Sequence, residues 1–338
     1  MLELTIKGKR INFIGDPHLG KNFGGVPLHR RGEREDSQFK QFSDELNSDH
    51  DLTIMVGDLF DTFNVSNDVL LTTMSIITEA SVANPDKKFI FISGNHDVSR
   101  DANVRGSFEI LDYYCCTLKN VMCYDFTFHI ELDDLDILLC PYSEFESASE
   151  AIKTFVDDKF DLVVGHWDTL EIGGTHNLMP FKQLAHMTNI VVSGHEHVPY
   201  IFYINKDGEH LKEMGEPDAI VYGTGSMQPY SHSEDPRGEK YVTRTVEQVL
   251  YELSENKDAF SDKCLRIVIE KGEEIPANIN CLQLGVKIVT ETQKEDLQVE
   301  LGNFDFEAMF KETFKENEVS EEMTKSYYGQ YKELATDA

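Results

Sequence analysis

Short apolar runs rich in β-branched residues recur along the first two thirds of the chain, and they predict buried β-strands. Between several runs, apolar residues three, four or seven positions apart predict amphipathic helices, as at Phe39, Phe42 and Leu46. The predicted strands are 11–14, 52–56, 89–92, 137–139, 162–164, 190–192 and 219–222, and further helices are expected at 69–80, 107–118 and 147–157. This alternation predicts a layered α/β domain over residues 1–240.

The pattern changes after residue 240. Residues 246–254 fit a helix or a strand, and 265–269 and 285–290 fit two strands of a small α+β capping domain over 241–298. Residues 299–338 predict a helical tail, in which four side chains share one helix face: Phe306, Met309, Phe310 and Phe314. That face either packs on the chain's own core or binds a partner.

Composition narrows the function classes. With 31 basic and 61 acidic residues the net charge is −30, which argues against extensive, sequence-independent binding to phosphate backbones. Any nucleic-acid contact must therefore be local or metal-assisted. The six cysteines lack CxxC spacing and predict free thiols of a reducing compartment. The start lacks a signal-peptide core and no apolar run reaches the roughly 18 residues of a membrane span. We expect a soluble, cytoplasmic protein with no membrane partner.

Glycine and then polar residues follow five of the predicted strands. The five segments are Gly15-Asp16-Pro17-His18, Gly57-Asp58-Leu59-Phe60-Asp61, Gly94-Asn95-His96-Asp97, Gly165-His166-Trp167-Asp168 and Gly194-His195-Glu196-His197. Because the carboxyl ends of strands in an open α/β sheet form the ligand crevice, these side chains are expected to meet there. We expect each glycine to permit a sharp turn.

Imidazole, carboxylate and amide groups in one crevice are ligands for borderline divalent ions. Seven such ligands can hold two ions that share one carboxylate, which is a two-metal hydrolase pattern. A single GNH or GH string is often only a turn with a solvent-exposed histidine. Five such motifs in succession, each after a buried strand, are not explained as solvated turns. The chain has no CxxC, HExxH or P-loop string, which excludes the common classes of zinc protease and NTPase.

The strings DPH, GDLFD, GNHD, GHW and GHEH, in this order, resemble the motifs of the calcineurin-like metallophosphoesterases. GDLFD and the later string YGTGSMQPYSHSEDPRG at 222–238 resemble the SbcD-type double-strand-break repair nucleases, particularly their bacteriophage recombination members. The resemblance covers about residues 10–240. It implies a β-sandwich flanked by helices, and a DNA exonuclease or endonuclease subunit of an SbcCD-like recombination and repair complex.

The resemblance also implies residue roles. One ion would take Asp16, His18, Asp58 and His197, and the other would take Asp58, Asn95, His166 and His195. His96 matches the catalytic histidine, a proton donor to the leaving oxygen, and Asp97 is expected to orient it. Asp61 departs from relatives that carry histidine there, so assistance by a second histidine is not expected. The mixed oxygen and nitrogen set favours manganese over magnesium, with zinc or iron as alternatives.

Basic residues gather after the first and third motifs. They predict a local DNA track, or else a solvated loop or partner contact: Lys21, Arg30, Arg31, Arg34, Arg100 and Arg105. The resemblance further implies an SbcC-type SMC-like ATPase partner, docked by the aromatic tail, and a homodimer within the complex. Two rival functions remain open: a phosphoprotein phosphatase or cyclic-nucleotide phosphodiesterase with the same site, and a non-catalytic interaction subunit.

Overall fold

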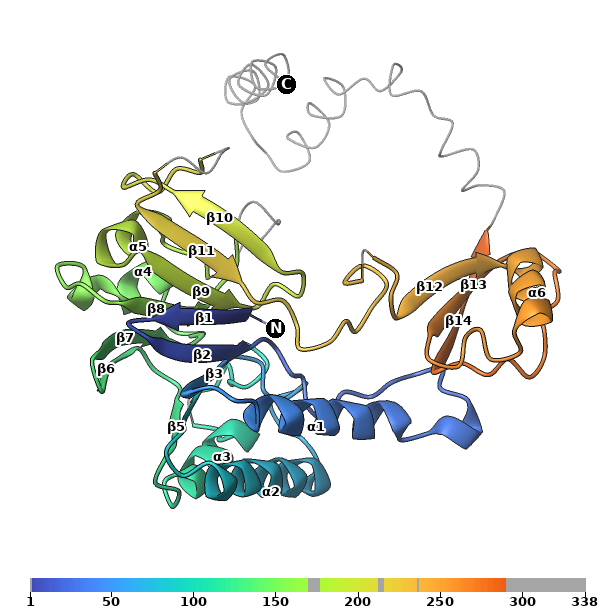
Figure 1. Ribbon diagram of the computed structural model, residues 1–338, viewed down its shortest axis with the longest axis horizontal. Helices are drawn as coiled ribbons and strands as arrows, with labels where there is room; N and C mark the ends of the chain where they lie inside the picture. The colour runs from blue at the N-terminus through green and yellow to red at the C-terminus, as the bar shows by residue number, and fades with distance from the viewer. Residues whose placement is uncertain (1, 102, 170–176, 212–215, 236, 290–338) are drawn as a thin grey trace, which may run out of the picture. The chain divides into compact units, whose positions relative to one another are not determined.

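The first sheet of the protein is mostly parallel. The structure is a computed structural model that describes residues 2–101, 103–169, 177–211, 216–235 and 237–289 (Figure 1). The strand order is β1-β2-β3-β4-β5, with bounds Leu2–Ile6, Lys9–Ile14, Leu52–Val56, Lys88–Ile92 and Val121–Tyr124. Strand β1 is antiparallel to β2, and β2 to β5 are parallel, so the ends of β2, β3 and β4 lie at one edge.

The second sheet has the order β10-β11-β9-β8-β7-β6. From β6 to β11 the strands span Phe128–Leu132, Leu135–Cys140, Leu162–His166, Ile190–Gly194, Tyr200–Ile204 and Ala219–Gly223. Strands β7, β8, β9 and β11 are parallel, whereas β6 and β10 pair antiparallel at the two edges. The ends of β8 and β9 therefore also share an edge.

Strand residues alternate between two cores, which places the sheets face to face. Ile54 and Ile90 of the first sheet and Leu139, Val164 and Val192 of the second belong to one buried cluster between the sheets. Their chain neighbours point to the helices instead, as Met55 and Phe91 do on the first sheet. Successive residues of a strand point to opposite faces of its sheet. Both faces are buried here, because one packs on the other sheet and the other is covered by helices.

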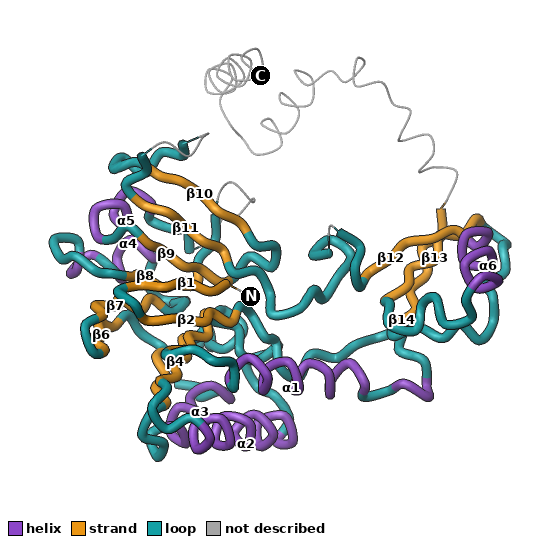
Figure 2. The backbone as a smooth tube through the Cα atoms, in the orientation of Figure 1, coloured by secondary structure: helices purple, strands orange, loops and turns teal. Residues whose placement is uncertain are grey.

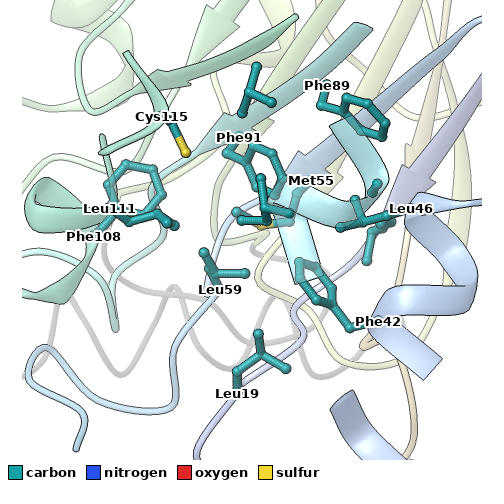
Figure 3. Close-up of a cluster of buried hydrophobic side chains, with 14 of the residues drawn as sticks. Leu19, Phe42, Leu46, Met55, Leu59, Phe89, Phe91, Phe108, Leu111 and Cys115 are labelled. Carbon is teal, nitrogen blue, oxygen red and sulfur yellow. The ribbon is translucent and has the colours of Figure 1, made fainter. Parts of the chain in front are cut away.

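Helices cover the outer faces of both sheets (Figure 2). On the first sheet lie α1 (Glu33–Leu46), α2 (Asn67–Ala83) and α3 (Ser107–Cys115), and Figure 3 shows their shared core of Phe42, Leu46, Phe89, Phe108 and Leu111. The second sheet packs on α4 (Ala148–Ala151), the turn η2 (Lys153–Phe155) and α5 (Phe181–Met187). The predicted layered α/β fold, a β-sandwich flanked by helices, is confirmed.

A third sheet follows the sandwich along the chain, in the order β12-β13-β14. Its strands are Tyr241–Thr245, Cys264–Glu270 and Gln283–Val289. The ambiguous stretch at 246–254 is a helix, α6 (Val246–Glu255), because the Thr245 hydroxyl caps its start by accepting from the Gln248 backbone N–H. Contacts divide the chain into two compact units, Met1–Ile267 with Pro276–Val286 and Val268–Ile275 with Lys287–Ala338. The domain limits at 240 and 298 stay predictions.

Of the remaining sequence predictions, some are confirmed and others are wrong. All seven predicted strands are found, and the six cysteines are free thiols. Helix α3 ends at Cys115 rather than 118, and the helix expected at 147–157 is only a short turn of α-helix with a 3-10 turn. The tail at 299–338, with its four apolar positions, lies outside the described residues. Within the described residues, no helix is long and apolar enough to cross a membrane.

Candidate metal centre

Five polar motifs meet at the carboxyl edges of the two facing sheets. Three follow β2, β3 and β4 of the first sheet, and two begin in the last residues of β8 and β9 of the second. The motifs are joined through the backbone, since His18 N–H donates to the Asp58 carbonyl at 2.9 Å and the Asp16 carboxylate accepts from His195 N–H at 2.9 Å. The crevice predicted at one sheet edge is therefore built from both sheets of the sandwich.

Several ligand candidates occupy left-handed backbone conformations. The φ angles are +28° at Asp16, +47° at His18, +49° at Asp58 and +81° at His195. Such conformations are costly for residues with a Cβ and recur at functional sites, where neighbouring structure enforces them. Here the enforcement comes from the hydrogen bonds between the motifs.

The glycines before the ligands serve close packing more than turning. A Cβ on Gly94 would lie 2.2 Å from Asp58 Oδ1, and one on Gly57 would lie 2.0 Å from His166 Nδ1. Of the five motif glycines only Gly57 has a positive φ, of +111°, so the predicted turn role is wrong for the other four. Gly57, Gly94 and Gly194 let another motif approach without a clash, whereas Gly15 makes room for Thr224 and Gly225 and Gly165 makes room for the Trp167 ring.

A first cluster consists of Asp16, His18, Asp58 and His197. The Nε2 atoms of His18 and His197 are 3.0 Å apart, His18 Nε2 is 3.7 Å from Asp58 Oδ2, and His197 Nε2 is 3.8 Å from Asp16 Oδ2. Asp16, His18 and Asp58 are almost fully buried. This is the ligand set that the sequence resemblance implies for one ion.

A second cluster shares Asp58 with the first and adds Asn95, His166 and His195. Asn95 Oδ1 lies 3.0 Å from His166 Nε2 and 2.9 Å from His195 Nδ1. His166 Nε2 lies 3.6 Å from Asp58 Oδ1, on the opposite carboxylate oxygen from the one that faces His18. The Asp58 carboxylate thus stands between the two clusters.

Burial and neighbouring charge set the protonation of these groups. Burial lowers the pKa of His18 to about 3 and that of His195 to about 4, so both imidazoles are neutral at neutral pH. Burial raises the pKa of Asp16 to about 6, with His166 opposing it. Burial also opposes ionisation of Asp58, but His166 outweighs it and keeps the pKa of that carboxyl below its usual value.

The donor set fits two divalent ions. Ligand atoms about 2.0 to 2.2 Å from an ion stand roughly 3 to 4 Å apart around it. The distances in the two clusters, 2.9 to 3.8 Å, fall in this range. Two imidazole nitrogens 3.0 Å apart fit rings that coordinate through Nε2, and Asp61 Oδ1 lies 3.5 Å from Nδ1 on the other side of the His18 ring. Burial lowers the pKa of His166, but Asp58 outweighs burial and raises this pKa to about 9. The His166 ring would therefore release a proton on binding a metal, since metals bind neutral histidines and ionised carboxylates.

Residues 9–199, more than half of the chain, match the family Metallophos, the calcineurin-like phosphoesterases. The chain belongs to this family. It is therefore a metal-dependent phosphoester hydrolase whose family binds two divalent ions. No curated protein matches it.

Solved structures with distant similarity include an archaeal phosphodiesterase, 15% identical, over 66% of this chain and 87% of that one, with a TM-score of 0.31. Another is a protein of unknown function from Aquifex aeolicus, 21% identical, over 47% of this chain and 80% of that one, with a TM-score of 0.23.

His96 of this phosphoesterase lies beside both clusters without belonging to either set of four. Its backbone N–H donates to Asp58 Oδ1 at 2.8 Å, its ring centroid is 4.8 Å from that of His18, and its side chain is exposed. Its Nδ1 is 2.6 Å from the Asp61 carbonyl oxygen. A proton on Nδ1 donated there leaves Nε2 available to a substrate.

Asp97 does not orient His96. The carboxylate of Asp97 accepts three backbone N–H groups, from Leu59, Phe60 and Gly94, at 2.9 to 3.0 Å. Burial, and then Asp58, raise the pKa of Asp97 to about 7. Asp97 therefore ties the second motif to the third, while the Asp61 carbonyl orients the His96 ring.

Two carboxylates and one phenol support the ligands from outside the predicted set. Glu234 Oε1 lies 3.4 Å from His197 Nδ1, Asp168 contacts His195 Nε2, and the buried Tyr230 hydroxyl donates to the Pro17 carbonyl. Glu234 and Tyr230 fall in the 222–238 string, which the resemblance singled out without assigning these residues. Asp168 directly follows the GHW motif. This position in the chain was the only sequence feature that pointed to a role for Asp168 at the site.

The predicted basic track is only partly available to a ligand. Arg34 is 2% exposed, stacks 3.7 Å above the Phe23 ring and donates to Gln283, so it is a packing residue. Arg30 is held by Glu33 and the Ser261 carbonyl. Lys21 is half-buried and pairs with Asp61 at 2.8 Å. The exposed members of the set are Arg31, Arg100 and Arg105.

Proposed function

We propose that this metallophosphoesterase is a DNA nuclease, the catalytic subunit of an SbcCD-like recombination and repair complex. The observation that carries the chemistry is the Asp58 carboxylate, whose two oxygens face separate ligand clusters 3.6 to 3.7 Å away. Two divalent ions bound there would activate water and neutralise charge on a phosphodiester. The mixed nitrogen and oxygen donors favour manganese over magnesium.

The chain's own residues hold the reacting groups. The Asp61 carbonyl fixes the His96 ring, and the His96 backbone N–H holds one oxygen of Asp58. In its protonated form His96 would donate from Nε2 to the departing sugar oxygen. Because the His96 side chain is exposed, it can reach a substrate that lies along the surface of the crevice.

The sequence resemblance and the position of exposed cationic side chains support DNA as the substrate. Arg100 and Arg105 follow the third motif, and both are exposed. The Arg100 side chain is 90% exposed and lies 3.7 Å from Glu144, and Arg105 donates to the Tyr113 hydroxyl. In a chain of net charge −30 they supply local positive charge for a phosphate backbone. The alternative functions are those of a phosphoprotein phosphatase or a cyclic-nucleotide phosphodiesterase, because the same ligands serve those reactions.

Comparing substrates and variants tests this proposal. With manganese supplied, we expect hydrolysis of DNA and no comparable hydrolysis of a phosphopeptide or a cyclic nucleotide. Combining Arg100→Ala with Arg105→Ala should raise KM for DNA but leave KM for bis(p-nitrophenyl) phosphate unchanged. Arg10→Ala is the matched control, since Arg10 is half-exposed at the opposite, amino end of β2. Equal activity on the cyclic nucleotide, or no KM change for DNA, contradicts the nuclease assignment.

The partner part of the proposal concerns an SbcC-type ATPase and a homodimer. It rests on the sequence resemblance and on the tail residues Phe306, Met309, Phe310 and Phe314. Truncation after Leu301 should abolish association with the ATPase but leave hydrolysis of bis(p-nitrophenyl) phosphate intact. A truncated chain that unfolds, or that loses this basal hydrolysis, contradicts the docking role.

A further inference from the structure

Two histidines of the metal centre contact a carboxylate on the ring nitrogen that faces away from their cluster. Glu234 Oε1 lies 3.4 Å from Nδ1 of His197, and an Asp168 oxygen contacts Nε2 of His195. The two carboxylates therefore meet opposite nitrogens of the imidazole ring. They also serve different clusters, since His197 belongs to the first and His195 to the second.

A neutral imidazole carries one N–H, and a carboxylate beside one nitrogen holds the proton there. The lone pair of the other nitrogen is then free. In His197 this is Nε2, which lies 3.0 Å from His18 Nε2. In His195 it is Nδ1, which lies 2.9 Å from Asn95 Oδ1 and 3.2 Å from His166 Nε2. In both residues the freed lone pair belongs to the nitrogen inside the cluster.

Glu234 is itself firmly placed. One of its oxygens accepts the Tyr230 backbone N–H at 2.7 Å and the other accepts the Ser231 hydroxyl at 3.0 Å. Tyr230 in turn donates its hydroxyl to the Pro17 carbonyl, next to two ligands of the first cluster. This segment thus braces the first cluster at both His197 and the Asp16-Pro17-His18 turn, although it lies beyond the family match at 9–199.

Asp168 is placed by the backbone around it. Its N–H donates to the Asn177 carbonyl at 3.3 Å, and its carbonyl accepts from Met179 N–H at 3.0 Å. Its side chain is largely buried. The backbone of Asp168 is therefore held by strand-like hydrogen bonds, and this fixes the carboxylate beside His195.

We propose that Glu234 and Asp168 are positioning residues that fix opposite tautomers, so that His197 binds one ion through Nε2 and His195 binds the other through Nδ1. Each carboxylate then controls one ion separately. The proposal rests on the two-ion centre but not on the choice of DNA as substrate, so hydrolysis of another phosphodiester leaves it standing.

The tautomers can be measured directly on the unmodified chain. Long-range ¹H–¹⁵N correlation spectra of the full-length, metal-free protein with ¹⁵N-labelled histidine, in alkaline buffer, should show the proton on Nδ1 of His197 and on Nε2 of His195. His197→Asn and His195→Asn variants assign the two signals. The same tautomer in both rings, or a mixture in either, overturns the proposal.

Variants then test the separate control of the two ions by manganese calorimetry on the full chain. Glu234→Ala should weaken one of two binding events by roughly 10- to 100-fold, and Asp168→Ala should weaken the other by a similar factor. In spectra of Glu234→Ala only the His197 signals should change. Glu239→Ala, an exposed carboxylate on the same segment paired with Arg237, is the matched control and should change neither event. Equal weakening of both events by each variant, at an unchanged thermal midpoint, contradicts separate control.

Discussion

The Nε2 atoms of His18 and His197 lie 3.0 Å apart, although 179 positions separate the two residues in the chain. The His18 ring follows β2 of the first sheet, and the His197 ring follows β9 of the second sheet, in the opposite layer of the sandwich. Two imidazole nitrogens at this distance cannot both keep lone pairs toward each other without a proton or a cation between them. Burial lowers the pKa of His18 to about 3, so His18 does not supply this proton at neutral pH.

Asp58→Asn should abolish hydrolysis while the fold survives. The amide oxygen can still accept the His96 backbone N–H, but the negative charge between the two clusters is gone. A loss of several kcal/mol of ion and transition-state stabilisation corresponds to a fall in kcat of at least about 10²-fold. Manganese-dependent kinetics check this, with the thermal midpoint as control. Retained activity excludes Asp58 as a shared ligand.

His96→Ser should leave both ions bound and slow cleavage. His96 belongs to neither set of four ligands, and loss of a general acid typically costs roughly 10²- to 10⁴-fold in rate. Calorimetry with manganese measures binding, and steady-state kinetics measure the rate. If the variant loses an ion, His96 is a ligand and the assignment is wrong.

Gly94→Ala should disrupt the centre because its Cβ would meet Asp58 Oδ1 at 2.2 Å and Asp58 N at 2.3 Å. Neither motif can move without breaking the hydrogen bonds of Asp97, so we expect weaker manganese binding and a loss of about 1 to 3 kcal/mol in unfolding free energy. Gly24→Ala is the control, since no atom lies within 4 Å of its Cβ position. Normal metal binding by Gly94→Ala speaks against the close-packing role.

Lys87 should make stability depend on pH far from the metal centre. Burial lowers the pKa of Lys87 to about 8, although Asp49 and Glu45 oppose it, whereas the unfolded value is 10.5. Between these values the unfolded chain binds more protons, so stability should rise as pH rises through this window, by at most about 1 kcal/mol per pH unit.

Denaturant unfolding of the wild type and Lys87→Met at both ends of that window measures this effect. The variant should lose the rise, and it should also lose stability at every pH because Lys87 Nζ donates to the Leu46 and Ser48 carbonyls. An identical pH dependence in both proteins shows that Lys87 does not titrate in this range.

The central strands and the ligand motifs could be predicted because both depend on local pattern. Buried parallel strands are continuous apolar runs, and each ligand follows such a run directly. Strands β1, β5, β6, β10 and β12 were missed because edge strands of a sheet carry mixed polar and apolar residues, as the half-exposed LELTI of β1 shows. The arrangement as two facing sheets came from the family resemblance rather than from periodicity.

Side-chain roles that depend on tertiary contacts could not be read from spacing. Asp97 directly follows His96 in the chain, yet its carboxylate is fully used by backbone N–H groups of two loops. Arg34 is a cation near the first motif, but it is buried between the Phe23 ring and Gln283. Glu234 is one of 61 acidic residues, and only the fold brings it to His197.

Anomalous scattering from crystals of the full chain grown with manganese tests the central claim most directly. The account predicts two peaks roughly 3.5 to 4 Å apart, one within bonding distance of Asp16, His18 and His197 and the other of Asn95, His166 and His195, with Asp58 bound to both. A single peak, or two peaks that do not share Asp58, would contradict it.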